Sequence, residues 1–522
     1  MRLVPVVLVI LAVLASAAGA PAKVVSGTPR ADRLIGTRGA DAIRGLAGND
    51  RLLGLAGADF LQGGPGRDTV DAGPGNDLVA VSYDGARDTV RCGSGTDVVN
   101  ADADDVVRSD CELVGRRLSR DPYTSADAQH ETEVEPDSFT AGRTTVATFQ
   151  VGRRFGGAAT NVGYAVTKDD GGTWRSGLLP GLTVASSPAG TNERASDPVV
   201  AFDAAHGTWL ISTLALEDGV TRLAINRSPD GSTWSNASAA AEESAAGGDE
   251  AIGFDKNWLA CDNTQTSPFY GRCYLVYTHS ADRDMLAVTW STDGGSTWSP
   301  PVNIGARPAV GVFPAIRPTG ELAVVYLWET NPSAIAASLS PDGGASWGAP
   351  VRIADLNAGC PIRGFRAFAL PSADVDRNGR IWATWHDCVP GASTNAVFVA
   401  TSDDGFSWTP PSVVTRGRNA VLPAIGIDPA TGRVAIAFMQ SSAAGVDVEL
   451  VESQGAAATF GAPRRLSAQS MPFQWMPNTT SGRMLGDYIS VHYARGRPLV
   501  VWVLATEPVV ASFRQAVYAT RG

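Results

Sequence analysis

Residues 167–174 read T-K-D-D-G-G-T-W, and the same eight-residue word, S/T-x-D-x-G-x-x-W, returns several times towards the C-terminus. Intact copies occupy 291–298, 340–347 and 401–408, a copy one residue shorter occupies 228–234, and a degenerate copy lies near 453–460. Recurrence at intervals of tens of residues indicates stacked modules of similar structure. Within the word, Asp can accept hydrogen bonds from backbone N–H groups just ahead of it, Gly tolerates positive φ, and Trp supplies a large apolar plug. The word therefore predicts a turn that is repeated from module to module.

The stretches between these copies have the pattern of short antiparallel strands. In a typical unit, strands at 196–202 and 209–213 flank a turn, a third strand at 221–226 leads into the word, and a short fourth strand follows Trp234. Four such strands form one blade of a β-propeller. Similar units begin near Glu135, Asp197, Asp255, Val312, Phe368, Val421 and Leu485. Residues 133–522 are therefore predicted to form an all-β propeller of seven blades, with six as the alternative. The last blade shows three clear strands, so we expect it to borrow one from near the preceding linker.

The repeated word resembles the Asp-box, or BNR repeat, of sialidases and related β-propellers, where it is a structural corner. True sialidases have six blades and keep their pocket at the central axis, on the face opposite the boxes. The resemblance places the candidate catalytic residues on that face: Arg194, Asp197, Arg363, Arg366, Arg483, Asp487 and Tyr488. The same face is expected to carry Glu135, Asp137, Glu193, Asp255, Lys256, His279, Asp282, Arg283, His386 and Asp387.

A sialidase needs three arginines around the substrate carboxylate, because the guanidinium fork is bidentate and always charged. It also needs a tyrosine nucleophile with a glutamate base, and an aspartate acid/base. Arg194, Arg366 and Arg483 are the candidate triad, and Tyr488 or Tyr493 the candidate nucleophile. The family's first arginine lies in an F/Y-R-I-P word, whereas residues 133–139 here read E-V-E-P-D-S-F. We therefore expect binding of a glycan or protein ligand without turnover. The alternatives are an active exo-α-sialidase and a purely structural surface protein.

A second repeat, nine residues long, occupies the N-terminal part. Aspartates are nine apart at Asp32, Asp41, Asp50, Asp59, Asp68 and Asp77; Asp88 follows after a two-residue insertion, and Asp97 restores the spacing. An apolar residue stands two positions after each, and a glycine two before most of them. This pattern resembles the G-G-x-G-x-D-x-U-x nonapeptide of RTX proteins, which winds into a parallel β-roll around calcium. The other interpretation is a disordered spacer rich in Gly and Asp.

The RTX resemblance implies a calcium-binding β-roll over residues 23–115. Stacked turns align carboxylates in rows that repel unless hard cations lie between them, and Ca²⁺ prefers carboxylate and carbonyl oxygens. The expected metal ligands are Asp41, Asp50, Asp59, Asp68 and Asp77. Leu46, Leu55 and Ala72 occupy places where the family prefers Gly or variable residues. The turns after Tyr83 are not expected to require an ion.

The remaining sequence features concern location and partners. Residues 1–22 have the pattern of a secretory signal peptide, residues 116–132 that of a polar linker, and no segment is long and apolar enough to span a membrane. The net charge is −11 and only three lysines occur, so nucleic acid and anionic membranes are poor partners. The resemblance to sialidase-like propellers implies an extracellular glycan or glycoprotein as the partner. Six cysteines in an exported chain favour disulfides, which we expect in sequential order. The third pair, Cys360–Cys388, would brace Arg363 and Arg366 beside His386 and Asp387, so that cluster ranks highest. The oligomeric state is left open.

Overall fold

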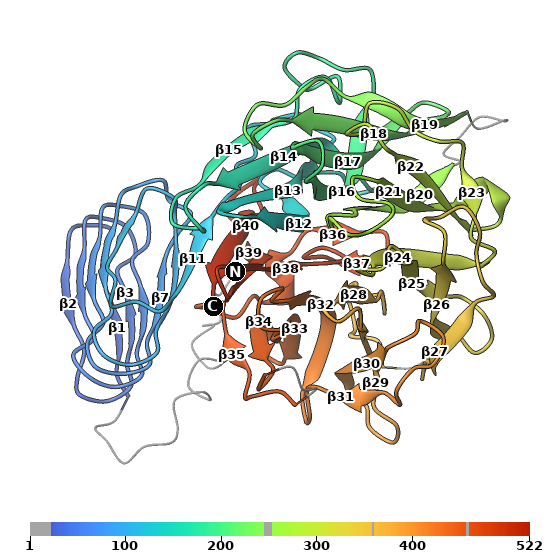
Figure 1. Ribbon diagram of the computed structural model, residues 1–522. Helices are drawn as coiled ribbons and strands as arrows, with labels where there is room; N and C mark the ends of the chain where they lie inside the picture. The colour runs from blue at the N-terminus through green and yellow to red at the C-terminus, as the bar shows by residue number, and fades with distance from the viewer. Residues whose placement is uncertain (1–21, 245–252, 358–359, 456–458) are drawn as a thin grey trace.

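The structure, a computed structural model, describes residues 22–244, 253–357, 360–455 and 459–522 (Figure 1). The expected signal peptide at 1–22 lies outside these residues except for Ala22. The described part of the chain is all-β and contains no α-helix. It also contains no helix long and apolar enough to cross a membrane.

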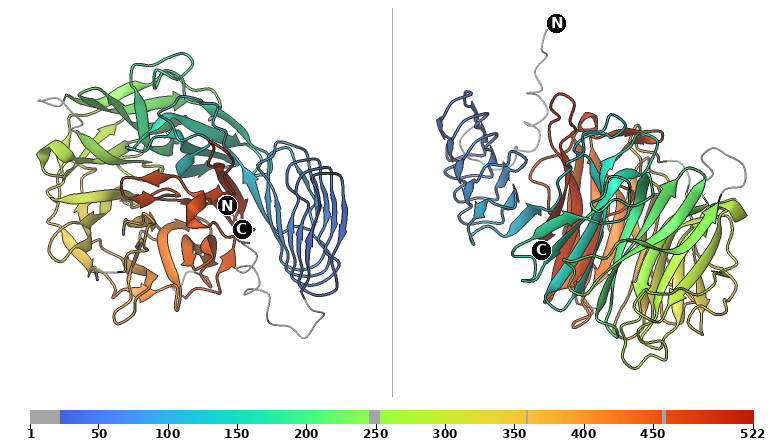
Figure 2. Two further views of the ribbon diagram at one scale, coloured as in Figure 1. Left: turned by 180° about the vertical axis from the view of Figure 1, so that it is seen from behind. Right: turned by 90° about the horizontal axis from the view of Figure 1, so that it is seen from above.

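The N-terminal part is a β-solenoid of about five turns, drawn in blue in Figures 1 and 2. Each turn uses two nonapeptides, so strands pair in parallel with strands about 18 residues further on, as Ile43 does with Leu61. One sheet contains β1 (Val24–Ser26), β3 (Ala42–Arg44), β5 (Phe60–Gln62), β7 (Leu78–Val81) and β9 (Val98–Ala101). The other contains β2 (Arg33–Ile35), β4 (Arg51–Leu53), β6 (Thr69–Asp71), β8 (Thr89–Arg91) and β10 (Val106–Val107). The apolar residue of each repeat is buried between the two sheets, which explains why the repeat needs one.

The predicted fold class, a β-propeller with Asp-box turns preceded by a short parallel β-roll, is wrong. The parallel part is a solenoid, and it does not precede a separate ring. Its first sheet continues through β11 (Leu113–Arg117) into β40 (Gln515–Arg521), β39 (Arg497–Ala505) and β38 (Ser490–Ala494). A repeat reveals its own period, but it does not reveal where the sheet it builds will end.

The rest of the chain forms antiparallel sheets that follow one another around a common centre (Figure 1). The first comprises β12 (Glu133–Ala141), β13 (Thr144–Arg153), β14 (Ala159–Thr167) and β15 (Arg175–Leu178), joined to β16 (Arg194–Asp203), β17 (Thr208–Glu217), β18 (Val220–Ser228) and β19 (Ser238–Ser244). Three further sheets comprise β20 (Phe254–Cys261) to β23 (Val302–Asn303), β24 (Ala309–Ile316) to β27 (Val351–Asp355), and β28 (Ser372–Val375) to β31 (Ser412–Val413). The next runs from β32 (Asn419–Ile427) to β35 (Arg464–Arg465), and a hairpin of β36 (Asn478–Thr479) and β37 (Gly482–Arg483) follows.

The repeated eight-residue word forms a hydrogen-bonded turn. In the copy at 291–298, Ser291 donates to Asp293 (2.8 Å), and Asp293 Oδ1 accepts from the backbone N–H groups of Ser296 and Thr297 (3.0 and 2.9 Å). The copy predicted at 401–408 starts one residue later, because Ser402 and Asp404 supply the hydroxyl and carboxylate. That copy therefore has the shorter seven-residue form. The carboxylates accept hydrogen bonds from backbone N–H groups in these turns, as the repeated word predicts.

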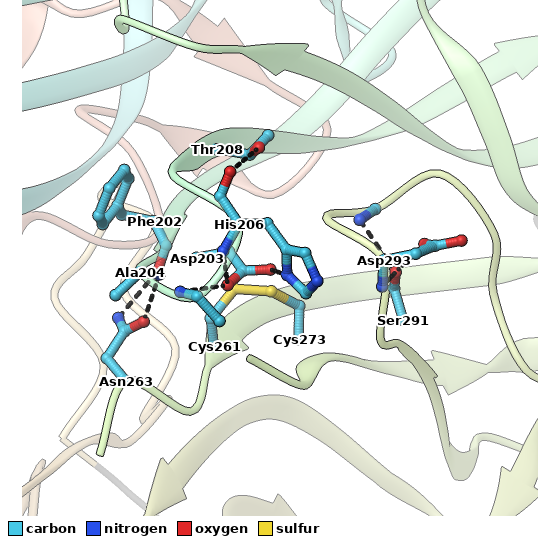
Figure 3. The surroundings of a disulfide bond; sticks show 12 residues. Phe202, Asp203, Ala204, His206, Thr208, Cys261, Asn263, Cys273, Ser291 and Asp293 are labelled. Atoms are coloured by element: carbon cyan, nitrogen blue, oxygen red, sulfur yellow. Dashed lines mark hydrogen bonds and ion pairs between the residues drawn. A yellow bond between two sulfur atoms is a disulfide. The ribbon is translucent and has the colours of Figure 1, made fainter. Parts of the chain in front are cut away.

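All three cysteine pairings expected from sequence order are confirmed: Cys92–Cys111, Cys261–Cys273 and Cys360–Cys388. Figure 3 shows the second pair joining the ends of β20 and β21 (Cys273–His279), beside the turn of Asp293. On the neighbouring sheet, the His206 ring bonds the buried Asp203 carboxylate at 2.6 Å. The first pair closes the end of the solenoid, where Cys92 and Cys111 pack against its core.

Candidate functional site

The solenoid carries two rows of buried carboxylates. Asp41, Asp50, Asp59, Asp68 and Asp77 are all at most 2% exposed. One oxygen of each accepts a backbone N–H from the turn 18 residues earlier, at 2.7–2.8 Å, as in Asp41 N to Asp59 Oδ1. Within the described residues, the second oxygen of Asp50, Asp59, Asp68 and Asp77 is buried without a hydrogen-bond partner. Each row therefore presents acceptor oxygens that lack a donor or a cation.

Electrostatics explain why these rows of carboxylates favour a bound cation. Burial, together with repulsion from neighbouring carboxylates, raises the pKa of Asp59, Asp68 and Asp77 to about 7, although backbone hydrogen bonds act in the opposite direction. A hard divalent cation would relieve both effects, because carboxylate and carbonyl oxygens are its preferred ligands. No three Asp, Glu, His or Cys side chains in the described ranges cluster tightly enough to hold a metal by themselves. Backbone carbonyls of the glycine-rich turns would therefore complete the ligand set.

A second group of charged residues lies where the antiparallel sheets meet. It is positioned by a β-bulge near the start of the first strand of several sheets. Glu135, Asp197 and Lys256 occupy the same bulge position in β12, β16 and β20, with φ of 54°, 47° and 45°. A bulge adds one residue to a strand and re-aims its side chain. The repeated bulge therefore directs three charged side chains, from β12, β16 and β20, towards one place.

Ion pairs connect Asp197, Lys256, Arg366 and Asp487, and Glu135, Arg153 and Asp255 lie within their electrostatic influence. These seven residues are here named the charged centre. Lys256 Nζ lies 2.9 Å from Asp487 Oδ2 and 3.4 Å from Asp197 Oδ1. Arg366 binds the Asp487 carboxylate with two nitrogens, Nε at 2.7 Å from Oδ1. Such fork-like pairing is strong and leaves little of the guanidinium free for another anion. Tyr488 lies alongside, with Lys256 Nζ 5.3 Å from its ring centre.

The carboxyl groups of the charged centre differ in protonation. Burial raises the pKa of Glu135 to about 8, with Asp197 and Asp487 adding to the effect. Burial alone would also raise the pKa of Asp487, but Lys256 and Arg366 outweigh it and hold that pKa well below its usual range. At pH 7, Glu135 therefore carries a proton while Asp487 is ionised. Gln150 donates to Glu135 and to Ser196 Oγ (3.0 Å), which fixes the glutamate side chain.

A cavity of about 200 Å³ runs along the first strands and is lined by Asp137, Trp258, Phe313, Asp374 and His492 among others. A smaller one, of about 30 Å³, lies between it and the charged centre and is lined by Lys256, Asp487 and Tyr488. Both cavities share Trp258, Phe313, Ser372 and Ile489. Aromatic faces beside charged hydrogen-bonding groups are typical of small-molecule sites.

The predicted arginine triad does not form around a shared acceptor. Arg366 binds Asp487, whereas Arg483 donates to the Met476 carbonyl oxygen at 2.6 Å. Arg194 is half-buried at the start of β16, and Arg363 is exposed. Of the seven candidate catalytic residues, the structure brings Asp197, Arg366, Asp487 and Tyr488 together, with Lys256 and Glu135 beside them.

The cluster ranked highest from sequence has other roles. Buried His386 accepts the Leu422 N–H through Nδ1 (3.2 Å), and burial lowers its pKa to about 4. Asp387 accepts the Asn357 backbone N–H at about 3.0 Å. Three of the remaining candidates have their own partners: His279 hydrogen-bonds to Glu243, Asp282 pairs with Arg307, and Asp137 accepts the Val200 N–H. The other two, Glu193 and Arg283, are exposed to solvent. Sequence reasoning missed Arg153, Gln150 and Trp258, because they lie on ordinary strands without a distinguishing motif.

Comparison with known proteins identifies the first of these sites. Residues 26–61 and 45–79 match the RTX calcium-binding nonapeptide repeat, so the solenoid carries calcium-binding repeats. Such repeats are typical of secreted proteins, and three disulfides fit an extracellular chain. No curated protein matches the chain significantly.

Several solved structures are weakly similar. A PL25 ulvan lyase bound to GlcA(1-4)Rha3S is 12% identical, with 76% of this chain and 97% of that chain covered and a TM-score of 0.45. The intramolecular trans-sialidase from Ruminococcus gnavus is 13% identical, with 77% and 96% covered and a TM-score of 0.41. An α-L-arabinanase of Penicillium chrysogenum complexed with arabinobiose is 13% identical, with 78% and 97% covered and a TM-score of 0.42. At these levels the likeness says nothing about the activity of this chain.

Proposed function

We propose that this protein is a secreted, calcium-binding protein whose charged centre and adjoining cavity bind the terminal sugar of an uncharged extracellular glycan without cleaving it. The calcium part rests on the RTX repeats and on the carboxylate oxygens that are buried without partners. The glycan part is supported by one observation above all: Trp258 and Phe313 line both the larger cavity and the smaller one that Lys256 and Asp487 also line. Sugars present an apolar face and a ring of hydroxyl groups, which such a lining matches.

The size and charge of the site limit the range of ligands that it can bind. A cavity of about 200 Å³ is smaller than the roughly 300–1,000 Å³ of most small-molecule sites. It suits one sugar residue rather than a length of polymer. Arg366 already holds Asp487 with its fork, and Lys256 neutralises Asp487 and Asp197. A sugar carboxylate would have to displace these pairs, so a neutral sugar is favoured over sialic acid.

Binding to lactose and 3′-sialyllactose tests the proposal, because the two ligands differ only in the sialic acid. In calcium, we expect lactose or a related neutral sugar to bind with measurable heat, and the sialylated form to bind less tightly. Trp258→Ala should abolish binding, whereas Trp290→Ala, at a partly buried tryptophan that does not line the cavity, should not. Preference for the sialylated ligand, or equal effects of the two variants, would refute the proposal.

A second candidate is a glycoside hydrolase. The observation that favours it is the opposite protonation of Glu135 and Asp487, since pairs of carboxyl groups with separated pKa values supply an acid and a base. An exo-α-sialidase is the less favoured form, because burial holds the pKa of Tyr488 well above its ordinary value and Arg366 is already paired. Turnover of fluorogenic sialosides or neutral glycosides that is lost in Glu135→Gln would establish this candidate over simple binding.

A further inference from the structure

One strand belongs to both parts of the molecule. β11 pairs in parallel with the solenoid strand β9, where Leu113 to Arg116 face Val98 to Ala101. It also pairs antiparallel with β40, with Gly115 opposite Thr520 and Arg117 opposite Tyr518. Figure 1 shows β11 between the blue solenoid and the red C-terminal strands. The last sheet, β38 to β40, therefore receives its outer strand from the calcium-binding part.

Side chains reinforce the contact that β11 makes with β9 and β40, here named the seam. Asn100 of β9 reaches into the C-terminal part, where it donates to the Leu466 carbonyl (3.2 Å) and accepts the Ala468 N–H (2.6 Å). Gly115 is placed so tightly that a Cβ would lie 2.8 Å from the Asn100 side chain and 3.4 Å from Trp502. Apolar residues of β9, β11, β39 and β40 share one buried core. The solenoid and the C-terminal sheet therefore share one continuous core along the seam.

A strained turn of the solenoid is held by the same seam. Tyr83 is buried with a φ of 79°, a conformation that is unfavourable for a bulky residue. Its ring lies under the Arg117 guanidinium at 3.7 Å and near that of Arg514 at 5.0 Å. Asp102 accepts the Tyr83 and Gly85 N–H groups at 3.0 and 3.1 Å. Such strain persists only where surrounding groups fix it, and here both parts supply them.

The far edge of the last sheet ends at the charged centre. β38 begins at Ser490, three residues after Asp487, and Ser490 Oγ lies 3.2 Å from Asp137 Oδ1 in the first antiparallel sheet. Asp487 in turn holds Lys256 and Arg366. A continuous path of paired strands, β9, β11, β40, β39 and β38, therefore joins the calcium rows to the charged centre.

We infer that calcium in the solenoid regulates the charged centre through this sheet. Without the cation, the buried carboxylate rows destabilise the solenoid turns, and β9 and β11 lose their order. β40 is then left as an open edge, and Asp487 loses the rigid sheet that positions it. The consequence for ligand affinity rests on the proposed function, whereas the coupling between the two parts does not.

Hydrogen–deuterium exchange on the full-length protein, in calcium and in EGTA, tests the coupling directly. We expect amides of β38 to β40 to exchange about 5–150-fold faster without calcium, the range of typical coupling energies. Amides of β24 to β27, on the far side of the molecule in Figure 1, should change little. If the solenoid loses protection while β38 to β40 keep theirs, the coupling is absent. If the far sheet loses protection equally, calcium acts on global stability and the inference also fails.

Seam variants separate coupling from calcium binding. Asn100→Ala removes both bonds to residues 466 and 468 but no carboxylate, so the solenoid should take up calcium as before while β38 to β40 gain less protection from it. The matched control is Asn226→Ala, a buried asparagine that also makes two backbone bonds, at 3.0 and 2.7 Å, away from the seam. Equal behaviour of the two variants would overturn the role of the seam. Calcium-dependent protection of β38 to β40 without any binding of lactose would leave the coupling intact and disprove the glycan proposal.

Discussion

Replacing Lys256 by methionine should destabilise the protein strongly, because this lysine neutralises a buried group of acids. Its side chain is 13% exposed, and that of Asp487, 2.9 Å away, is fully buried. Two unit charges about 4 Å apart attract by about 4 kcal/mol at an effective dielectric constant of 20. Removing one partner of a buried pair typically costs about 3–5 kcal/mol, since the remaining charge stays buried and uncompensated. We expect a loss of this size for Lys256→Met at pH 7.

The chain provides its own control for this experiment. Lys168 pairs with Asp230 at 3.3 Å, but both side chains are about half exposed, so Lys168→Met should cost about 0–1 kcal/mol. Thermal unfolding in saturating calcium measures both variants. At pH 5 the deficit of Lys256→Met should shrink, because burial raises the pKa of Asp255 to about 6, and protonation of this carboxyl group below pH 6 relieves the excess negative charge. Equal costs for the two variants at pH 7 would refute the interpretation of the charged centre as a coupled buried network.

Three further outcomes are expected. Burial raises the pKa of Asp59, Asp68 and Asp77 to about 7 in the folded state, so folding takes up protons. The calcium-free solenoid should therefore be most stable below about pH 4 and lose stability as the pH rises to about 7. Far-UV circular dichroism in EGTA would show this, with the opposite trend once calcium is added. Leu46→Gly should stabilise the solenoid by about 1 kcal/mol in chemical unfolding, because Leu46 is exposed at a φ of 77°, whereas Leu61→Gly removes a buried side chain and should destabilise it. Asp293→Ala should lower stability by about 0.5–1.5 kcal/mol, because the exposed Ser296 and Thr297 N–H groups lose the carboxylate but can bind water, and ligand affinity measured by calorimetry should be unchanged. Hydrogen bonds from Thr297 outweigh the opposing effect of burial and keep the pKa of Asp293 at about 2, so the loss should be constant above pH 4.

Regular spacing made the carboxylate rows and the buried core of the N-terminal part predictable from sequence, although the predicted fold class was wrong. Aspartates nine residues apart, each with an apolar companion, define carboxylate rows and a buried core before any coordinates are known. The order of the cysteines was likewise sufficient to pair them. Local chemistry also predicted the turn at Asp293, although the neighbouring aspartates at 403 and 404 concealed which one bonds in the later copy.

Long-range pairing was predicted only in part. The three clear strands of the last unit indicated that it borrows a strand from near the linker, and β11 supplies that strand. Nothing local in Leu113 to Arg117 indicates that it completes a sheet with the last strand of the chain. The charged centre was only partly found: Asp197, Arg366, Asp487 and Tyr488 were chosen by loop position, but the convergence of Glu135 and Lys256 depends on bulges with positive φ. Such a conformation leaves no mark in a sequence when the residue is not glycine. Arg153 was missed because a charged residue at the end of an interior strand usually faces solvent.

The pairing of Gly115 with Thr520 also has a consequence for biosynthesis. The two residues are about 400 positions apart, so one side of this contact is translated long before the other. Because closing so large a loop costs entropy that is recovered only when the contact forms, this sheet can assemble only after β40 has been translated. A nascent chain that ends before β40 would carry two unsatisfied strand edges, on β11 and on β39, and would be a natural target for chaperones and proteases.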